Sequence, residues 1–153
     1  MHQPSEIKRH LEHRTSILRE FIAGRRAVSR NGFNCYFDAT LITCRSLFGL
    51  LGVTTTSFDE TDLKNPTKSK ISFSRFQEIR DSISPLVIIK PFSSEADLDA
   101  LPEKAEIIKV LVAANMCVAH FEKYLDHGVD ESDLELAAKR LLHELSDRIQ
   151  LPL

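Results

Sequence analysis

Two polar residues, Asn115 and His120, stand near the end of the longest apolar run of the chain, IIKVLVAANMCVAHF at residues 107–121. The Asn115 amide can donate a hydrogen bond to a phosphate oxygen, although it has no charge with which to stabilise a developing anion. Residues five apart on a helix point about 140° away from each other. One straight helix therefore cannot aim both side chains at one atom, although a two-fold axis could bring the missing partner from another chain. The alternative to a functional role for His120 is a structural one, in which its ring lies at the margin of the core and forms a hydrogen bond through one ring nitrogen.

Two arginines, Arg45 and Arg14, are candidates for binding an anion. Arg45 lies within an amphipathic run at residues 33–51, where it either faces solvent or lines a cleft that binds an anion. Arg14 belongs to an arginine-rich segment that also holds His10 and His13, and such a segment is either a solvated surface or a basic patch for RNA phosphates. Aromatic residues are not interleaved there, so a stacking platform for single strands is not supported.

The elements that must position these side chains are helices, because apolar residues recur at three- and four-residue spacing along much of the chain. The sequence predicts four main helices, at residues 4–30, 33–51, 102–127 and 131–151. The first is expected to end at the turn dipeptide Asn31-Gly32 and the second at Gly52. Asp130 and Asp133 predict a capping arrangement at the start of the last helix. The helix at 102–127 is apolar on most of its circumference, so it belongs in the middle of a bundle.

A long connection separates the second helix from the central one. Residues 53–72 are polar and are predicted to form a loop, and apolar residues within 71–83 predict a short helix. Residues 86–89 could form a short strand, but no partner is evident, so they are treated as an extended, buried connector. Ser94 is expected to cap a short turn through Leu101. The prediction is one all-α domain over residues 1–153, a four-to-five-helix up-and-down bundle with an irregular connection in the middle.

The charge distribution limits the classes of partner that the protein can bind. The net charge of −2 excludes a strongly basic nucleic-acid binder by bulk charge alone. Residues 1–30 contain seven Lys or Arg and three Asp or Glu, whereas residues 91–153 contain six and thirteen. A chain with one basic and one acidic end can attract an anion at the basic end, or it can self-associate.

Cysteine usage and hydropathy indicate a cytoplasmic protein away from membranes. The three cysteines are an odd number without a repeated spacing, which is typical of reduced thiols that behave as small apolar residues. The first twenty residues are charged throughout, so no signal peptide is expected. No apolar run approaches the roughly 20 residues that cross a bilayer.

A metal site is the third chemistry that the spacing allows. Cys117, His120 and His127 lie near one face of the predicted central helix, but zinc needs about four ligands and no second pair completes the set. Glycine-rich phosphate loops and serine or threonine nucleophile motifs are absent from the sequence. No metal or cofactor is therefore predicted.

The helical layout, the Ala119-His120 step and Arg45 within an amphipathic second helix resemble the HEPN family, the higher eukaryote and prokaryote nucleotide-binding domains. These are small helical bundles whose hallmark is an arginine followed, after four to six residues, by a histidine. Asn115 stands where that arginine is expected. The resemblance implies metal-independent RNA cleavage at a site shared by two subunits. His120 would handle a proton at the 2′-hydroxyl or the leaving oxygen, and an arginine would stabilise charge on the phosphate.

With Asn115 in the place of the arginine, weak or no nuclease activity is expected unless Arg45 or an N-terminal arginine such as Arg14 substitutes. We therefore expect a homodimer that is either a feeble ribonuclease or a degenerate relative that binds nucleic acid, a nucleotide or a protein partner. The context would be RNA-related, as in defence or toxin–antitoxin systems. The alternative is a non-catalytic helical module for protein–protein interaction and dimerisation.

Overall fold

The computed structural model describes residues 4–24, 30–55, 71–72, 87–119 and 129–150. Within these ranges the chain forms five helices: α1 (Pro4–Ile22), α2 (Arg30–Leu50), α5 (Glu95–Asp99), α6 (Lys104–Ala119) and α8 (Glu131–Arg148). The predicted all-α helical bundle is confirmed, and the four long helices correspond to the four main helices predicted. No helix in the described part of the chain is long and apolar enough to cross a membrane.

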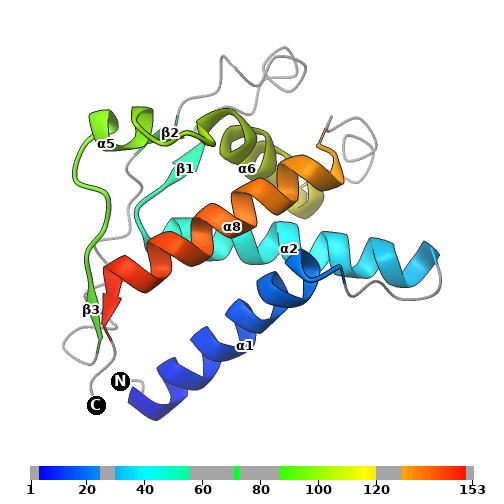
Figure 1. Cartoon of the computed structure of the whole chain (residues 1–153), viewed down its shortest axis with the longest axis horizontal. Coiled ribbons are helices and arrows are strands. Elements are labelled where there is room, and N and C mark those ends of the chain that lie inside the picture. The colour runs from blue at the N-terminus through cyan, green and yellow to red at the C-terminus, as the bar shows by residue number, and fades with distance from the viewer. Residues whose placement is uncertain (1–3, 25–29, 56–70, 73–86, 120–128, 151–153) are drawn as a thin grey trace.

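The core lies where the four long helices meet. α6 packs against α2 and α8, and α1 packs against the same two helices. Figure 1 shows α8 crossing in front of α2. In the same view α6 lies behind the N-terminal half of α8, and α1 lies on the other side of α2 from α6. In α6 every residue from Ile107 to Asn115 except Lys109 is buried. The prediction that this apolar helix is central to the bundle is therefore confirmed.

α2 buries the stripe that its sequence predicts. The members of that stripe that the structure describes are all buried: Phe37, Leu41, Cys44, Phe48 and Leu51. At the α1–α2 contact, the rings of Phe21 and Phe37 meet edge to face with their centroids 6.2 Å apart. Edge-to-face pairs add attraction between the positive ring edge and the negative ring face to the burial of both rings. This contact fixes where α1 crosses α2.

The end of α1, the start of α2 and the start of α6 differ from those predicted. α1 ends at Ile22, before Gly24, whose φ of 67° is the left-handed backbone that terminates helices. Asn31-Gly32 lies inside the first turn of α2, where Asn and Gly cost little because the first N–H groups have no helical partner in any case. α6 begins at Lys104, and Pro102 lies in the preceding turn. The predicted end of α2 at Gly52, with φ 81°, is confirmed.

Two short antiparallel pairings join segments that are distant in the sequence. β1 (Thr54–Thr55) pairs with β2 (Ile71–Ser72), so the stretch predicted to be a loop, residues 53–72, contains two paired strands. Ile71, the first apolar residue assigned to the predicted short helix, belongs to β2, and 73–83 lie outside the described residues. β3 (Ile88–Ile89) pairs with β4 (Ile149–Gln150), which gives the possible strand at 86–89 its partner. α8 consequently ends at Arg148, before the predicted end of the last helix. Periodicity is a local signal and cannot reveal such long-range pairings.

Both predicted helix caps are confirmed. The Ser94 hydroxyl accepts a hydrogen bond from the Asp97 backbone N–H at the start of α5. At the start of α8, Asp130 and Asp133 exchange side-chain and backbone hydrogen bonds at 2.8 and 3.2 Å, which completes a capping box. Lys109 of α6 lies 3.3 Å from the Asp133 carboxylate, so this cap also connects α6 to α8.

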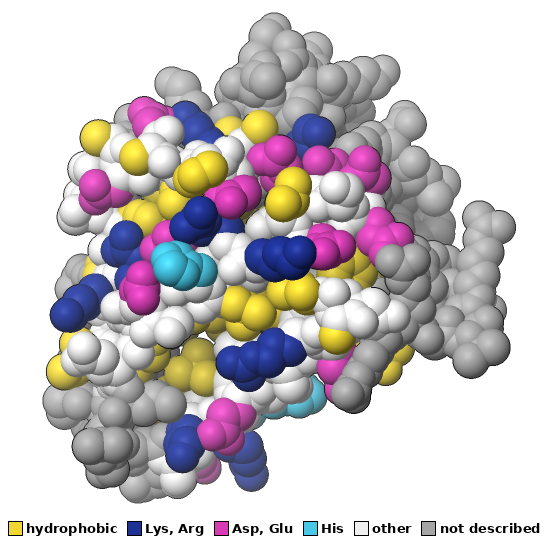
Figure 2. All heavy atoms as spheres, in the orientation of Figure 1, with side chains coloured by type: hydrophobic (Ala, Val, Ile, Leu, Met, Phe, Trp, Pro, Cys, Tyr) yellow, Lys and Arg dark blue, Asp and Glu magenta, His cyan; other side chains and the backbone are white. Residues whose placement is uncertain are grey.

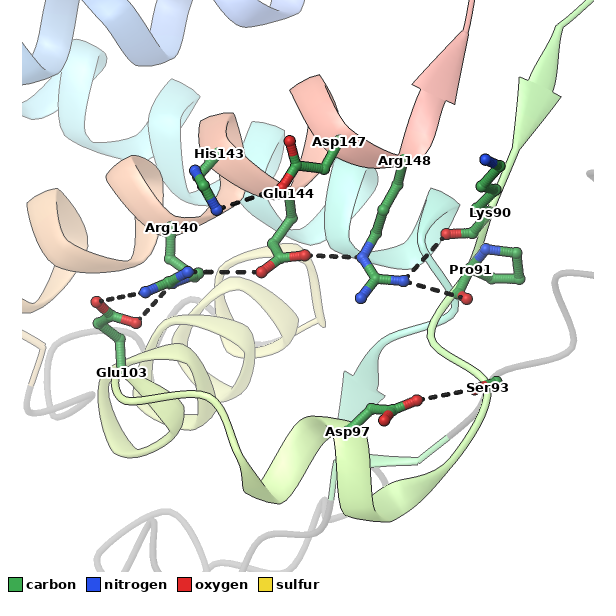
Figure 3. A network of polar contacts seen from close by, with 10 residues as sticks. All are labelled: Lys90, Pro91, Ser93, Asp97, Glu103, Arg140, His143, Glu144, Asp147 and Arg148. Atoms are coloured by element: carbon green, nitrogen blue, oxygen red, sulfur yellow. Dashed lines mark hydrogen bonds and ion pairs between the residues drawn. The ribbon is translucent and has the colours of Figure 1, made fainter.

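A polar network runs along α8 and connects it to the segments before α6 and around β3 (Figure 3). Arg140 donates two hydrogen bonds to the Glu103 carboxylate, at 2.7 and 3.3 Å, and lies 3.6 Å from Glu144. Glu144 accepts a further hydrogen bond at 2.7 Å from Arg148. Arg148 also donates to the backbone oxygens of Lys90 and Pro91. The network therefore attaches the middle and the C-terminal end of α8 to the connection that precedes α6.

Candidate functional site

A pocket of about 420 Å³ opens between α1, α2, α6 and the start of β1. Nine residues line it: Arg14, Ile42, Arg45, Ser46, Gly49, Val53, Thr54, Leu111 and Asn115. Three of the four residues singled out from the sequence, namely Arg14, Arg45 and Asn115, thus meet in one place, although they come from three different helices. The fourth, His120, lies outside the described residues.

α2 contributes one wall of the pocket. Its four lining residues, Ile42, Arg45, Ser46 and Gly49, follow the helical spacing of three, four and seven residues, so they share one face of the helix. This face is adjacent to the buried stripe, and Arg45 and Ser46 on it are exposed. The side chain of Arg45 is therefore exposed and also lines a pocket, and the binding of an anion there stays a prediction.

Arg14 enters the pocket from the inward side of α1. It continues the alternating four- and three-residue spacing of the core-facing residues Ile7, Leu11, Leu18 and Phe21. Its side chain is half-buried, and it lines the pocket rather than the outer surface. Arg14 is therefore partly covered, unlike Arg9 and Arg19 of the same helix, which are exposed. Its heptad position was the sequence signal that could have identified it.

Asn115 belongs to the inner end of the pocket. Its side chain is 8% exposed, and its amide nitrogen donates a hydrogen bond of 2.9 Å to the hydroxyl oxygen of Thr55, which is 4% exposed. Buried polar groups are normally paired in this way, because an unpaired amide in the interior costs the free energy of its lost hydration. One of the two amide hydrogens is thus occupied by Thr55. Asn115 fixes β1 on α6 and forms part of the pocket floor with Leu111 and Val53, which are also buried.

The pocket carries positive charge, and no carboxylate balances it among the described residues that line it. None of the nine described lining residues is Asp or Glu. Between side chains of the described residues, the ion pairs use other cations, from Lys8 on α1 to Arg148 on α8. By contrast, positive and negative side chains are mixed over α8 on the face seen in Figure 2. Two guanidinium groups in one pocket whose described lining has no acidic side chain are suited to bind an anion.

The α8 network differs from the pocket because its charges are matched within the protein. The hydrogen bonds from Arg140 hold the pKa of Glu103 below its usual range, and the same contact raises the pKa of Arg140. The Arg148 guanidinium lies 3.8 Å from the centre of the Phe92 ring, where the ring face attracts a cation. The donors and acceptors of this network are satisfied by one another, so we interpret it as a structural brace.

Metal-ligating groups do not gather in the part of the chain that the structure describes: no three His, Cys, Asp or Glu residues there could hold a metal ion together. Burial raises the pKa of the Cys44 thiol well above its usual value, so this cysteine is protonated and unreactive. The interpretation of Cys117, His120 and His127 as ligands concerns side chains outside the described set.

Sequence reasoning missed the residues that complete the pocket. Ile42 is 44% exposed and lies one turn before Arg45, on the face that the amphipathic pattern assigns to solvent. Thr54 and Thr55 belong to a stretch predicted to be a loop, and no local pattern marks either threonine as the partner of a residue on α6.

Comparisons with protein families, with curated proteins and with solved structures gave no match to this chain.

Proposed function

We propose that this chain is a HEPN-like homodimeric module that binds RNA through the Arg14–Arg45 pocket, with weak or no cleavage of its own. The observation that carries the proposal is the convergence of Arg14 from α1 and Arg45 from α2 on one pocket, where no described lining residue is a carboxylate. Guanidinium groups present planar sets of N–H donors that match the oxygens of a phosphate. The resemblance to HEPN domains supplies RNA as the source of that phosphate.

Binding is favoured over cleavage because of the position of Asn115. Cleavage needs a group that moves protons and a charged group that stabilises the phosphate in the transition state. Asn115 is neutral, and one of its amide hydrogens is engaged by Thr55. Arg14 and Arg45 can hold a phosphate without it. In the HEPN interpretation His120 is the proton-transfer residue, and a second subunit completes the site.

RNA binding by the wild type and by matched variants tests the proposal. Fluorescence anisotropy would compare Arg14→Ala and Arg45→Ala with Arg9→Ala, because Arg9 is exposed on α1 and does not line the pocket. Loss of a charge-assisted contact to phosphate should weaken binding about tenfold or more in each pocket variant. Arg9→Ala should bind RNA like the wild type. An equal loss in Arg9→Ala would assign binding to the general basic surface of α1, and no binding by the wild type would refute the proposal.

Cleavage and assembly are separate measurements. Solution mass determines whether the chain dimerises, and an RNA-cleavage assay on wild type and His120→Ala determines whether it is catalytic. A dimer whose cleavage disappears in His120→Ala would establish a working shared site. A dimer that neither binds nor cleaves RNA would favour the alternative, a protein–protein interaction module.

A further inference from the structure

We infer that the Arg14–Arg45 pocket binds a terminal phosphate monoester, at the end of an RNA chain or on a single nucleotide, in preference to an internal phosphodiester. This inference rests on the proposed function, because it specifies which phosphate of RNA the pocket takes. Three properties of the pocket support it: its charge, the burial of part of its wall and its size.

The charge of the lining matches a dianion. Arg14 and Arg45 supply two positive charges, and none of the lining residues that the structure describes is acidic. A phosphate monoester carries about −1.5 to −2 at neutral pH because its second pKa is about 6. A phosphodiester carries a single negative charge and would leave one guanidinium without a matching charge. Two guanidinium groups, one from α1 and one from α2, can instead contact different oxygens of one terminal phosphate.

Part of the pocket wall is buried. Gly49, Val53, Leu111 and Asn115 line the pocket and are buried, whereas Ile42, Arg45 and Ser46 line it and are exposed. An internal phosphate has chain on both sides and needs room for both strands of chain. A terminal phosphate has chain on one side only, so it can approach the buried part of the wall with less obstruction.

The size and the apolar surface suit one nucleotide. A volume of about 420 Å³ lies at the lower end of the range of small-molecule sites, which extends from about 300 to 1,000 Å³. The side chains of Ile42, Val53 and Leu111 offer apolar surface for a ribose or a base, and the hydroxyls of Ser46 and Thr54 are available at the same pocket for polar edges. A run of several nucleotides would extend beyond these contacts.

The test compares RNA oligonucleotides of one sequence that carry a 5′-phosphate, a 3′-phosphate or hydroxyls at both ends. A terminal phosphate should tighten binding to the wild type by about tenfold. The advantage should disappear in Arg45→Ala and Arg14→Ala and persist in Arg9→Ala. Arg45→Lys should lose most of the preference for phosphorylated RNA, because lysine keeps the charge but lacks the planar set of N–H donors of a guanidinium. Lowering the pH from about 7.5 to about 5 should reduce the advantage, because the monoester then becomes a monoanion.

Competition identifies the source of the phosphate. A nucleoside 5′-monophosphate should displace the phosphorylated RNA at lower concentration than inorganic phosphate does, because only the nucleotide reaches the apolar wall. Equal binding of phosphorylated and unphosphorylated RNA, with dependence on both arginines, would overturn the inference and leave the proposed function standing. Equal competition by inorganic phosphate would overturn the assignment to a nucleotide. Failure of every RNA to bind, with thermal unfolding unchanged in all variants, would overturn both.

Discussion

Asn115 on α6 donates a hydrogen bond of 2.9 Å to the hydroxyl oxygen of Thr55 on β1, across sixty residues of sequence. Both side chains are buried, so if one of them were removed, the other could not form a hydrogen bond with bulk water instead. The same contact places β1 against the central helix. Asn115 thus has a structural role in the described fold.

We predict that Asn115 and Thr55 are energetically coupled. Asn115→Ala and Thr55→Val should each lower the free energy of unfolding by about 1–3 kcal/mol, because each leaves a buried polar partner unpaired. The double variant should lose less than the sum of the two, by about 0.5–1.5 kcal/mol. Chemical denaturation of the four proteins in the cycle measures this coupling. Strict additivity would show that the hydrogen bond contributes nothing to stability.

The Arg140–Glu103 contact should stabilise the fold more than a neighbouring surface pair. Both side chains are only 22–23% exposed, and Arg140 makes a two-pronged contact with Glu103. We expect Arg140→Met to cost about 1–2 kcal/mol of unfolding free energy. The matched control is Lys139→Met, whose ion pair with Glu135 is far more exposed and should contribute about 0.5 kcal/mol or less. A similar loss in both variants would contradict the interpretation of this network as a brace.

The same contact makes a prediction about pH. The pKa of Glu103 is lowered in the folded protein, chiefly by its hydrogen bonds from Arg140. A carboxylate with a depressed folded pKa contributes stability at pH values above its unfolded pKa of about 4.3 and loses it as the pH falls through the folded pKa. The difference in unfolding free energy between wild type and Arg140→Met should therefore be constant near neutral pH and shrink below about pH 4. Denaturation curves at several pH values test this, and a difference that grows in acid would contradict it.

Arg148 should hold the β3–β4 pairing in place. It donates to the backbone oxygens of Lys90 and Pro91, lies over the Phe92 ring and pairs with Glu144. Lysine cannot reproduce this planar set of contacts, so Arg148→Lys should behave almost like Arg148→Ala. The informative measurement is amide hydrogen exchange at Lys90, whose N–H donates to the Arg148 backbone oxygen at 2.8 Å. We expect this amide to lose protection while amides within α6 keep theirs. Unchanged exchange at Lys90 would contradict the role assigned to Arg148.

The sequence was most informative where the signal was local. The stripe of α2, the apolar circumference of α6, the Ser94 cap and the Asp130–Asp133 capping box all follow from spacings of a few residues, and the structure confirms them. Local reasoning also selected Arg14, Arg45 and Asn115, but it could not show that they meet. Their convergence depends on how α1, α2 and α6 cross, and those crossings are set by packing among residues far apart in the chain.

The wrongly predicted helix ends and the missed role of Thr55 also depend on contacts that local sequence patterns do not show. Ile149 fits the stripe of α8, but its backbone pairs with Ile89, some sixty residues earlier, and this pairing ends the helix. Gly24 and Asn31-Gly32 are both plausible breaks between the first two helices, and a left-handed backbone at Gly24 decides between them. Thr55 is unremarkable in the sequence because its partner, Asn115, belongs to another element.

The substitution Asn115→Arg tests whether charge at this position limits the site. A guanidinium there would add a third positive charge to the pocket wall, so binding of phosphorylated RNA should tighten several-fold, by about 1 kcal/mol. The same change removes the donor to Thr55 and should cost about 1–3 kcal/mol of unfolding free energy. Thr55→Ala is the control, because it removes the hydrogen bond without adding charge and should lower stability without tightening binding. If Asn115→Arg gains RNA cleavage that His120→Ala then abolishes, the asparagine is the reason for weak catalysis in the wild type. If Asn115→Arg folds and binding does not tighten, the pocket does not bind phosphate beside Asn115.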